Sequence, residues 1–261
     1  MFGVVPKSIW QRDYPADENN LCAWAMRCLL VEEGDKKILI DTGIGDKQDD
    51  KFFSYVYLHG EDSLDKSLND LGLSVSDITD VVLTHLHFDH VGGAVINDKG
   101  NLKPKFPKAT YWTNERHLST ATSPNVREKA SFLEENILPL EESGQLGLIE
   151  EGISPFSFMS FYWVSGHTEA QMLPIITYGD RKIVFCADLF PSVGHIPLSY
   201  IMAYDMQPLL TLKEKEKFLK QAFDNDYVLF FEHDPTIECC TIQKTEKGMR
   251  VKNTFLLSEL A

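Results

Sequence analysis

Short apolar runs that end in a polar group form the main pattern of hydrophobic and polar positions along this chain. Apolar and β-branched residues fill the runs, which are too short for helices, so the pattern predicts buried strands. Glu33-Gly34-Asp35 separates two apolar segments at 21–31 and 37–40, which predicts a hairpin. The other predicted strands cover 81–84, 110–112, 146–149, 156–164, 172–177, 182–186 and 227–231.

Helical periodicity lies between these strands. Leu64, Leu68 and Leu71 repeat at i, i+4 and i+7, which predicts an amphipathic helix capped by Asp62 or Ser63. Further helices are predicted at 114–120, at 124–138 with Pro124 in the first turn, and at 211–223. The aromatic stretch 52–57 fits neither period. It suits core packing, a pocket wall or a subunit contact.

Strands alternating with helices predict a layered α/β fold, and no linker or repeat interrupts it. We therefore expect a single domain over 1–261. Five predicted strands end in a chemically active group, and ligands of α/β proteins bind beyond the carboxyl ends of strands. These groups are Asp41, the cluster at 85–90, His167, Asp188 and His233.

The cluster reads His85-Leu86-His87-Phe88-Asp89-His90. On an extended backbone, His85 and His87 point the same way. Imidazole and carboxylate are the usual ligands of zinc and similar divalent metals. A polar loop is the alternative explanation, but this density of ligand types directly after a buried strand favours a metal site. Asp41 is either a turn former or a group that orients a metal ligand.

Charge and cysteine content narrow the possible partners and compartments. The formal net charge of −14 disfavours nucleic acid and anionic membranes as partners. No apolar stretch is long enough to span a membrane, and the N-terminus lacks a secretory signal. An odd number of irregularly spaced cysteines indicates reduced thiols, so we expect a cytoplasmic protein.

The motifs resemble those of the metallo-β-lactamase-fold hydrolases. The resemblance rests on residues 85–90, Ser165-Gly166-His167, Ala187-Asp188, Glu232-His233-Asp234 and Asp41-Thr42-Gly43, and it extends from about residue 20 to 235. It implies a four-layer αββα sandwich with two divalent metal ions. Zinc is the expected metal, with manganese or iron as alternatives on the same ligands.

The same resemblance implies how the ligands divide. One metal would be bound by His85, His87 and His167, and the other by Asp89, His90 and His233, with Asp188 bridging them. Two such cations supply hydroxide near neutral pH and stabilise an oxyanion. Asp89, a ligand beside that nucleophile, is the candidate catalytic residue for proton transfer.

Departures from family patterns disfavour several relatives. Many β-lactamases of this fold have Cys where this chain has Asp188, and the diiron oxygen reductases have Glu in place of His87. Too few residues follow His233 for the glutathione-binding domain of glyoxalase II. The acidic charge disfavours the RNA-processing members. The chain thus resembles the lactonase and organophosphate-hydrolase branch.

One position departs from the lactonases as well. Acyl-homoserine-lactone lactonases typically have a Tyr three residues after the bridging Asp, where this chain has Pro191. His195, Tyr200 and Tyr204 are candidates to take the place of that Tyr, and a packing or surface role is the alternative for each.

The sequence therefore predicts a dinuclear metal-dependent hydrolase that cleaves an ester, lactone or related bond of a small molecule through a metal-bridging hydroxide. The alternatives are a phosphodiesterase or organophosphate hydrolase, and a non-catalytic metal-dependent binding protein of the same fold. The aromatic stretch at 52–57 is compatible with a homodimer.

Overall fold

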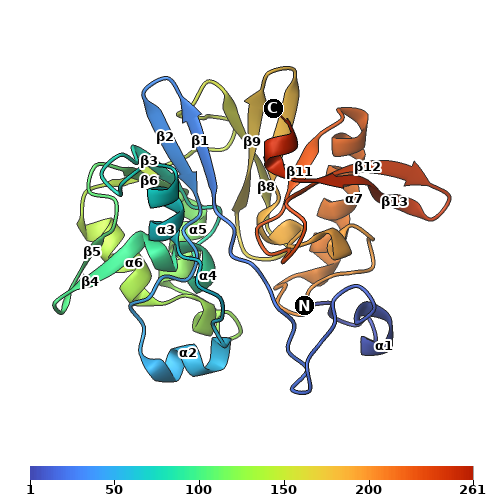
Figure 1. Ribbon diagram of the computed structural model, residues 1–261, viewed down its shortest axis with the longest axis horizontal. Coiled ribbons are helices and arrows are strands. Elements are labelled where there is room, and N and C mark those ends of the chain that lie inside the picture. Colours follow the sequence, from blue (N-terminus) through green and yellow to red (C-terminus); the bar gives the residue numbers. More distant parts are fainter. Residues whose placement is uncertain (261) are drawn as a thin grey trace. The chain divides into compact units, whose positions relative to one another are not determined.

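The computed structural model describes residues 1–260 and divides into two compact units. One unit is the continuous segment Cys28–Ile149, and the other combines Met1–Arg27 with the chain from Glu150 onward. Each unit contains a main sheet with its own helices (Figure 1). The expected single domain over 1–261 stays a prediction.

The unit formed by residues 28–149 is built on a five-stranded sheet. β1 (Leu29–Glu33) and β2 (Lys36–Ile40) form the predicted hairpin, and β2 continues in parallel to β3, β6 and β7. The latter strands cover Asp80–Val82, Thr110–Thr113 and Leu146–Leu148. A separate hairpin is formed by β4 (Val95–Asp98) and β5 (Asn101–Pro104).

Five helices accompany this sheet: α2 (Asp50–Val56), α3 (Leu64–Asp70), α4 (Phe88–Val91), α5 (Glu115–Thr122) and α6 (Glu134–Glu142). The predicted helix at Leu64 is confirmed as α3, and Ser63 caps it by accepting a hydrogen bond from the Lys66 amide at 3.2 Å. Leu68 of α3 packs with Val81 and Tyr111 of the sheet in one apolar core. Burial of this side of the helix anchors it on the sheet.

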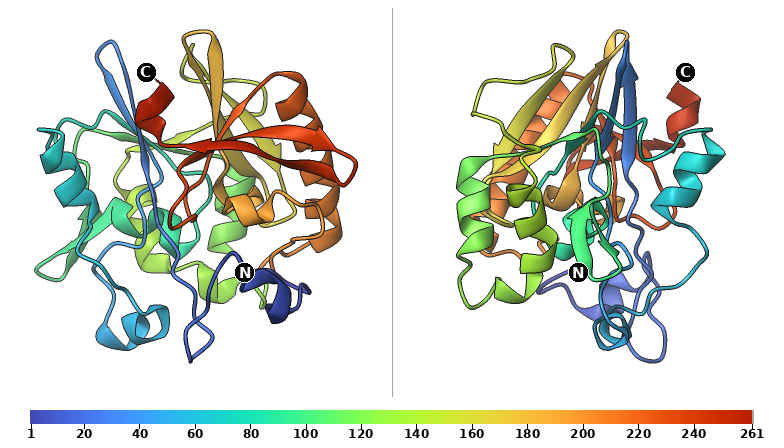
Figure 2. Two further views of the ribbon diagram at one scale, coloured as in Figure 1. Left: turned by 45° about the vertical axis from the view of Figure 1, so that its right-hand side comes forward. Right: turned by 90° about the vertical axis from the view of Figure 1, so that its left-hand side faces the viewer.

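The other unit is built on a six-stranded sheet in the order β13-β12-β11-β10-β9-β8. All neighbours are antiparallel except β10 and β11. The bounds are β8 Met159–Val164, β9 Gln171–Tyr178, β10 Arg181–Phe185, β11 Val228–Phe230, β12 Cys239–Thr245 and β13 Gly248–Phe255. Figure 2 shows the β12–β13 hairpin as a long red ribbon.

Two helices belong to this unit, the short α1 (Lys7–Trp10) and the long α7 (Pro208–Asp224). Helix α7 confirms the predicted helix at 211–223 and buries Phe218, Leu219 and Ala222. These side chains pack with Val184 and Leu229 of the sheet. No helix among the described residues is long and apolar enough to cross a membrane.

Three sequence predictions differ from the structure. The strand predicted from residue 21 begins only at Leu29, because the amides of Ala25 and Arg27 donate instead to the carbonyls of His233 and Glu232. The aromatic stretch at 52–57 falls largely in helix α2, which Asp49 caps. The helix predicted at 124–138 is instead a turn followed by α6, and α6 continues through Pro139.

Strand direction brings the candidate groups to common edges within each unit. β2 and β3 are parallel, so Asp41 and the 85–90 cluster follow them at the same edge of their sheet. In the other unit β10 and β11 are parallel, so Asp188 and His233 also follow at a common edge. β8 runs the same way as β10 because both are antiparallel to β9, which adds His167 to that edge.

Candidate metal centre

The histidine motif occupies a tightly packed turn after β3. His87 precedes helix α4 with an extended backbone, and Asp89 and His90 lie inside that helix. The two glycines that follow let the loop after β2 approach closely: a Cβ at Gly92 would lie 2.1 Å from the Ile44 carbonyl oxygen. The ring centroids of His85 and His87 are 4.6 Å apart, and those of His85 and His90 are 3.9 Å apart.

Asp41 organises this turn from the end of β2. Its carboxylate accepts hydrogen bonds from the Thr84 amide at 2.8 Å, the Thr84 hydroxyl at 2.6 Å and His90 Nδ1 at 2.9 Å. The side chain is fully buried, and its backbone has a left-handed φ of 55°. Buried carboxylates persist when their oxygens are this well satisfied. Asp41 therefore holds the backbone before His85 and the ring of His90 together.

These bonds assign the protons on two imidazoles. The Thr84 hydroxyl donates to Asp41, so its oxygen accepts from His85 Nδ1 at 3.1 Å. His90 Nδ1 likewise donates to a carboxylate that can only accept. Both rings therefore carry the proton on Nδ1 and have the lone pair on Nε2. This arrangement is the one that orients histidine ligands in metalloproteins.

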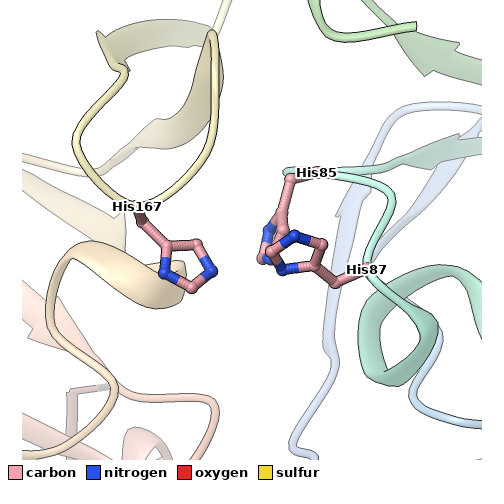
Figure 3. A group of neighbouring side chains, drawn as sticks. All are labelled: His85, His87 and His167. Carbon is pink, nitrogen blue, oxygen red and sulfur yellow. The ribbon is translucent and has the colours of Figure 1, made fainter. Parts of the chain in front are cut away.

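His87 is held in the opposite way. Its Nε2 lies 3.2 Å from Oε1 of Glu128, a carboxylate that is 2% exposed. His87 therefore donates from Nε2, and Nδ1 carries the lone pair. Figure 3 shows the rings of His85 and His87, which leave the loop after β3, and the ring of His167, which leaves the loop between β8 and β9.

In the other unit, Asp188 lies between two histidines. Its Oδ2 is 3.1 Å from His167 Nε2, and its Oδ1 is 3.0 Å from His233 Nε2. The opposite nitrogens are bound elsewhere: His167 Nδ1 donates to Asp205 at 3.0 Å, and His233 Nδ1 donates to the Ala25 carbonyl at 2.8 Å. Each ring thus turns a nitrogen lone pair towards a carboxylate oxygen.

That arrangement tests whether a metal fits these donors. Neutral imidazole nitrogen and carboxylate oxygen are both acceptors, so facing each other at 3.0–3.1 Å they repel unless positive charge lies among them. Protons or a divalent cation supply that charge, and two imidazoles with one carboxylate are common zinc ligands. The donor types and their orientation fit a metal.

The loop that carries His167 is fixed from helix α7. Glu214 accepts hydrogen bonds from the amides of Ser165 at 2.7 Å and Gly166 at 2.9 Å. A Cβ at Gly166 would lie 2.4 Å from the Thr211 amide, so glycine permits the loop to touch the helix. Burial raises the pKa of Glu214, and the two amide bonds oppose that shift.

His195, considered from sequence as a pocket residue, has a packing environment. Its ring stacks on Phe2 with centroids 4.7 Å apart, Nδ1 accepts from the Ser192 hydroxyl at 2.8 Å, and Nε2 donates to the Met1 carbonyl at 3.2 Å. Both nitrogens are thus engaged, and neither is directed at the other candidate ligands. Tyr204 is exposed, and Pro191 accepts the His233 amide through its carbonyl.

This burial predicts a pH effect on stability. Desolvation lowers the pKa of His195 to about 3, so below pH ~6.5 the unfolded chain binds a proton that the folded chain does not. The stabilisation is present above that pH and is lost as the pH falls towards 3. Between pH 6.5 and 5, we expect about 2 kcal/mol of lost unfolding free energy from this residue. Urea unfolding of wild type and His195→Asn at both pH values measures it.

The exposed residue His59 supplies the control. His59→Asn should keep the wild-type pH dependence, whereas His195→Asn should flatten it. An unchanged pH dependence in His195→Asn would contradict a neutral, buried imidazole.

Several residues that hold the candidate ligands were missed from sequence. They are Thr84, Glu128, Asp205 and Glu214. Glu128 is 41 positions from His87 and Asp205 is 38 positions from His167. Thr84 is the last residue of the predicted strand 81–84, and its sequence context indicates no role beyond that strand. The other three do not follow a predicted strand directly. No periodicity or motif marks the others.

Fold and donor types together describe a metal-dependent hydrolase. The sequence profile of the Metallo-beta-lactamase superfamily matches residues 27–233, and the chain belongs to that superfamily. The predicted fold class, the αββα sandwich, is thereby confirmed, as is the prediction of a hydrolytic enzyme.

Individual relatives agree with this assignment. A probable metallo-hydrolase of Mycobacterium tuberculosis is 24% identical over 240 residues, which is 80% of this chain and 74% of that protein. An N-acyl homoserine lactonase of Bacillus cereus is 30% identical over 128 residues, covering 44% of this chain and 49% of that protein.

Solved structures are similar over more of the chain. A probable metal-dependent hydrolase from Staphylococcus aureus has a TM-score of 0.88 at 26% identity, covering 98% of this chain and 90% of that one. The dizinc quorum-quenching lactonase AidC, solved with the product N-hexanoyl-homoserine, has a TM-score of 0.73 at 25% identity over 89% of this chain and 81% of that one. The lactonase-like resemblance seen in the sequence is confirmed.

Proposed function

We propose that this protein is a dinuclear metal hydrolase that opens an ester or lactone of a small molecule. The donors His85, His87 and His167 would hold one ion, and Asp89, His90 and His233 the other, with Asp188 shared. The observation that carries this proposal is the pair of acceptor–acceptor contacts at Asp188, which call for positive charge that two metal ions would supply.

Two bound divalent cations lower the pKa of a water molecule towards neutrality and polarise a substrate carbonyl. The protein's own contribution is orientation. Four imidazoles are fixed through Nδ1 and one through Nε2, so each presents a single lone pair. Asp89, about one third exposed and 3.8 Å from His90 Nε2, is the proposed group that accepts and returns a proton during hydrolysis.

An ester or lactone is proposed as substrate because the relatives named above include lactonases. Pro191 stands three residues after Asp188, where the resemblance to acyl-homoserine-lactone lactonases implies a Tyr. We therefore propose a substrate whose carbonyl does not rely on a phenol at that position.

Zinc is the proposed metal, since imidazole and carboxylate suit it and a related lactonase is dizinc. A cytoplasmic location is proposed because an odd number of irregularly spaced cysteines indicates reduced thiols. A homodimer that uses the exposed Tyr55 and Tyr57 is proposed as well.

Metal content and a substrate panel test the proposal. We expect about two ions per chain after purification without chelator, by elemental analysis; fewer than about 0.5 contradicts a dinuclear centre. The panel contains lactones, aryl esters, phosphodiesters, phosphotriesters and a glutathione thioester, each with added zinc or manganese. Turnover of a lactone or ester is expected. Turnover of phosphate esters alone, or of nothing in the panel, contradicts the proposed substrate class.

A further inference from the structure

We propose that Glu128 is a positioning residue that determines which nitrogen of His87 faces the metal. The inference rests on the proposed function, because it concerns the same donor set. It adds a residue that lies outside every motif of the chain and assigns it a task that can be measured apart from hydrolysis.

The carboxylate of Glu128 is buried, and the free energy of removing it from water must be offset by its partners. It is 2% exposed, and an ionised group at such a place persists only with partners. Its Oε1 faces His87 Nε2 at 3.2 Å, and its Oε2 accepts from Asn125 Nδ2 at 3.1 Å. One oxygen is thus committed to the histidine and the other to the residue that fixes the carboxylate.

Asn125 also sets the backbone from which Glu128 projects. Its Oδ1 accepts hydrogen bonds from the amides of Arg127 at 2.9 Å and Glu128 at 3.1 Å. This side-chain turn replaces the helix that the sequence predicts here. The turn therefore has a local cause, and its outcome is to direct a carboxylate at His87.

His87 differs in its bonded nitrogen from the other candidate histidine ligands. The hydrogen bonds that orient the rings of His85, His90, His167 and His233 are made through Nδ1, whereas the bond to Glu128 is made through Nε2 of His87. An isolated imidazole adopts either tautomer, and a carboxylate hydrogen bond selects one. The ring of Phe132, 4.8 Å from that of His87, packs beside the imidazole but carries no polar group to select a tautomer.

The first experiment measures zinc affinity in competition with a chelator. Glu128→Leu keeps the approximate volume but removes the acceptor, and we expect the affinity for one of the two ions to fall ten- to a hundredfold, as for other residues that orient metal ligands. The exposed Glu134 on helix α6 supplies the matched control: Glu134→Leu should bind both ions as wild type does. Wild-type affinity for both ions in Glu128→Leu would overturn the proposal.

A paired exchange serves as the rescue. In the double variant Asn125→Asp with Glu128→Gln, the introduced amide oxygen can accept from His87 and the introduced amide nitrogen can donate to the new carboxylate. The bond from His87 keeps its direction, the bond between positions 125 and 128 is reversed, and the charge moves one group away. We expect the double variant to recover most of the affinity lost in Glu128→Leu. Affinity no better than that of Glu128→Leu would count against a positioning role.

The tautomer itself is read by long-range proton–nitrogen correlation NMR of the histidine rings in the full-length, metal-stripped protein. Wild-type His87 should carry its proton on Nε2, and the other four ligands on Nδ1. A wild-type His87 protonated on Nδ1 overturns the proposal even if Glu128→Leu fails to fold. A wild type that binds no pair of ions, but shows the expected tautomers, would instead contradict the proposed function.

Discussion

Asp188→Ala is expected to lose hydrolysis and the second metal together. Its two oxygens lie 3.1 and 3.0 Å from His167 and His233, so the change removes a group that both rings contact. Loss of a residue that only orients a metal ligand lowers metal affinity or activity by about 10–100-fold. For a direct shared ligand, we therefore expect activity to fall by at least about a hundredfold and the metal content to drop towards one ion per chain. Steady-state kinetics and elemental analysis of the same preparation measure both.

The exposed Asp180, in the turn between β9 and β10, is the matched control. Asp180→Ala removes the same charge from the same unit and should keep activity and metal content. The assignment of Asp188 is wrong if Asp188→Ala retains both ions and wild-type turnover.

Changes at Asp41 should separate its two tasks. Asp41→Asn keeps a side chain that tolerates the left-handed backbone but removes the charge that holds His90. We expect a ten- to hundredfold loss of metal affinity with modest loss of stability. Asp41→Ala also removes the acceptor for both Thr84 donors and His90 Nδ1, and at about 1–3 kcal/mol for each unsatisfied donor we expect at least about 3 kcal/mol less unfolding free energy.

Denaturant unfolding of the metal-stripped variants and zinc titration measure these two effects. The exposed Asp226 has a similar left-handed φ of 50° but none of these partners, so Asp226→Ala isolates the backbone strain, expected to cost about 1–2 kcal/mol. Equal destabilisation of the Asp41→Ala and Asp226→Ala variants would mean that the hydrogen bonds of Asp41 contribute nothing.

The sequence predicted the strands and the groups at their ends because both depend on local order. A buried strand needs a run of apolar residues, and the chain must turn after it, so Asp41, Asp188 and His233 were visible as residues. The sheet edge at which each of these residues lies follows from the direction of its strand alone. The helix at Leu64 was visible for the same reason, since its period and its cap are both local.

The supporting residues were not visible because their partners are set by tertiary packing. Nothing near Asp205 in sequence indicates that its carboxylate meets His167, and nothing near Glu128 points to His87. The turn at Asn125 shows the same limit: the apolar pattern allowed a helix, but a side chain that caps two amides ended it.

The hydrogen bond from His233 Nδ1 to the Ala25 carbonyl bears on the order in which the chain folds. The two residues are 208 positions apart, and residues 28–149 form a compact unit of their own between them. During synthesis, the central unit can fold before the chain from Glu150 onward, with which the first 27 residues form the other unit, has been made. Contacts of such long sequence separation form slowly because the loop must close first. The orientation of His233 is therefore established late as the protein is made, because its bond to Ala25 can form only after residue 233 has left the ribosome.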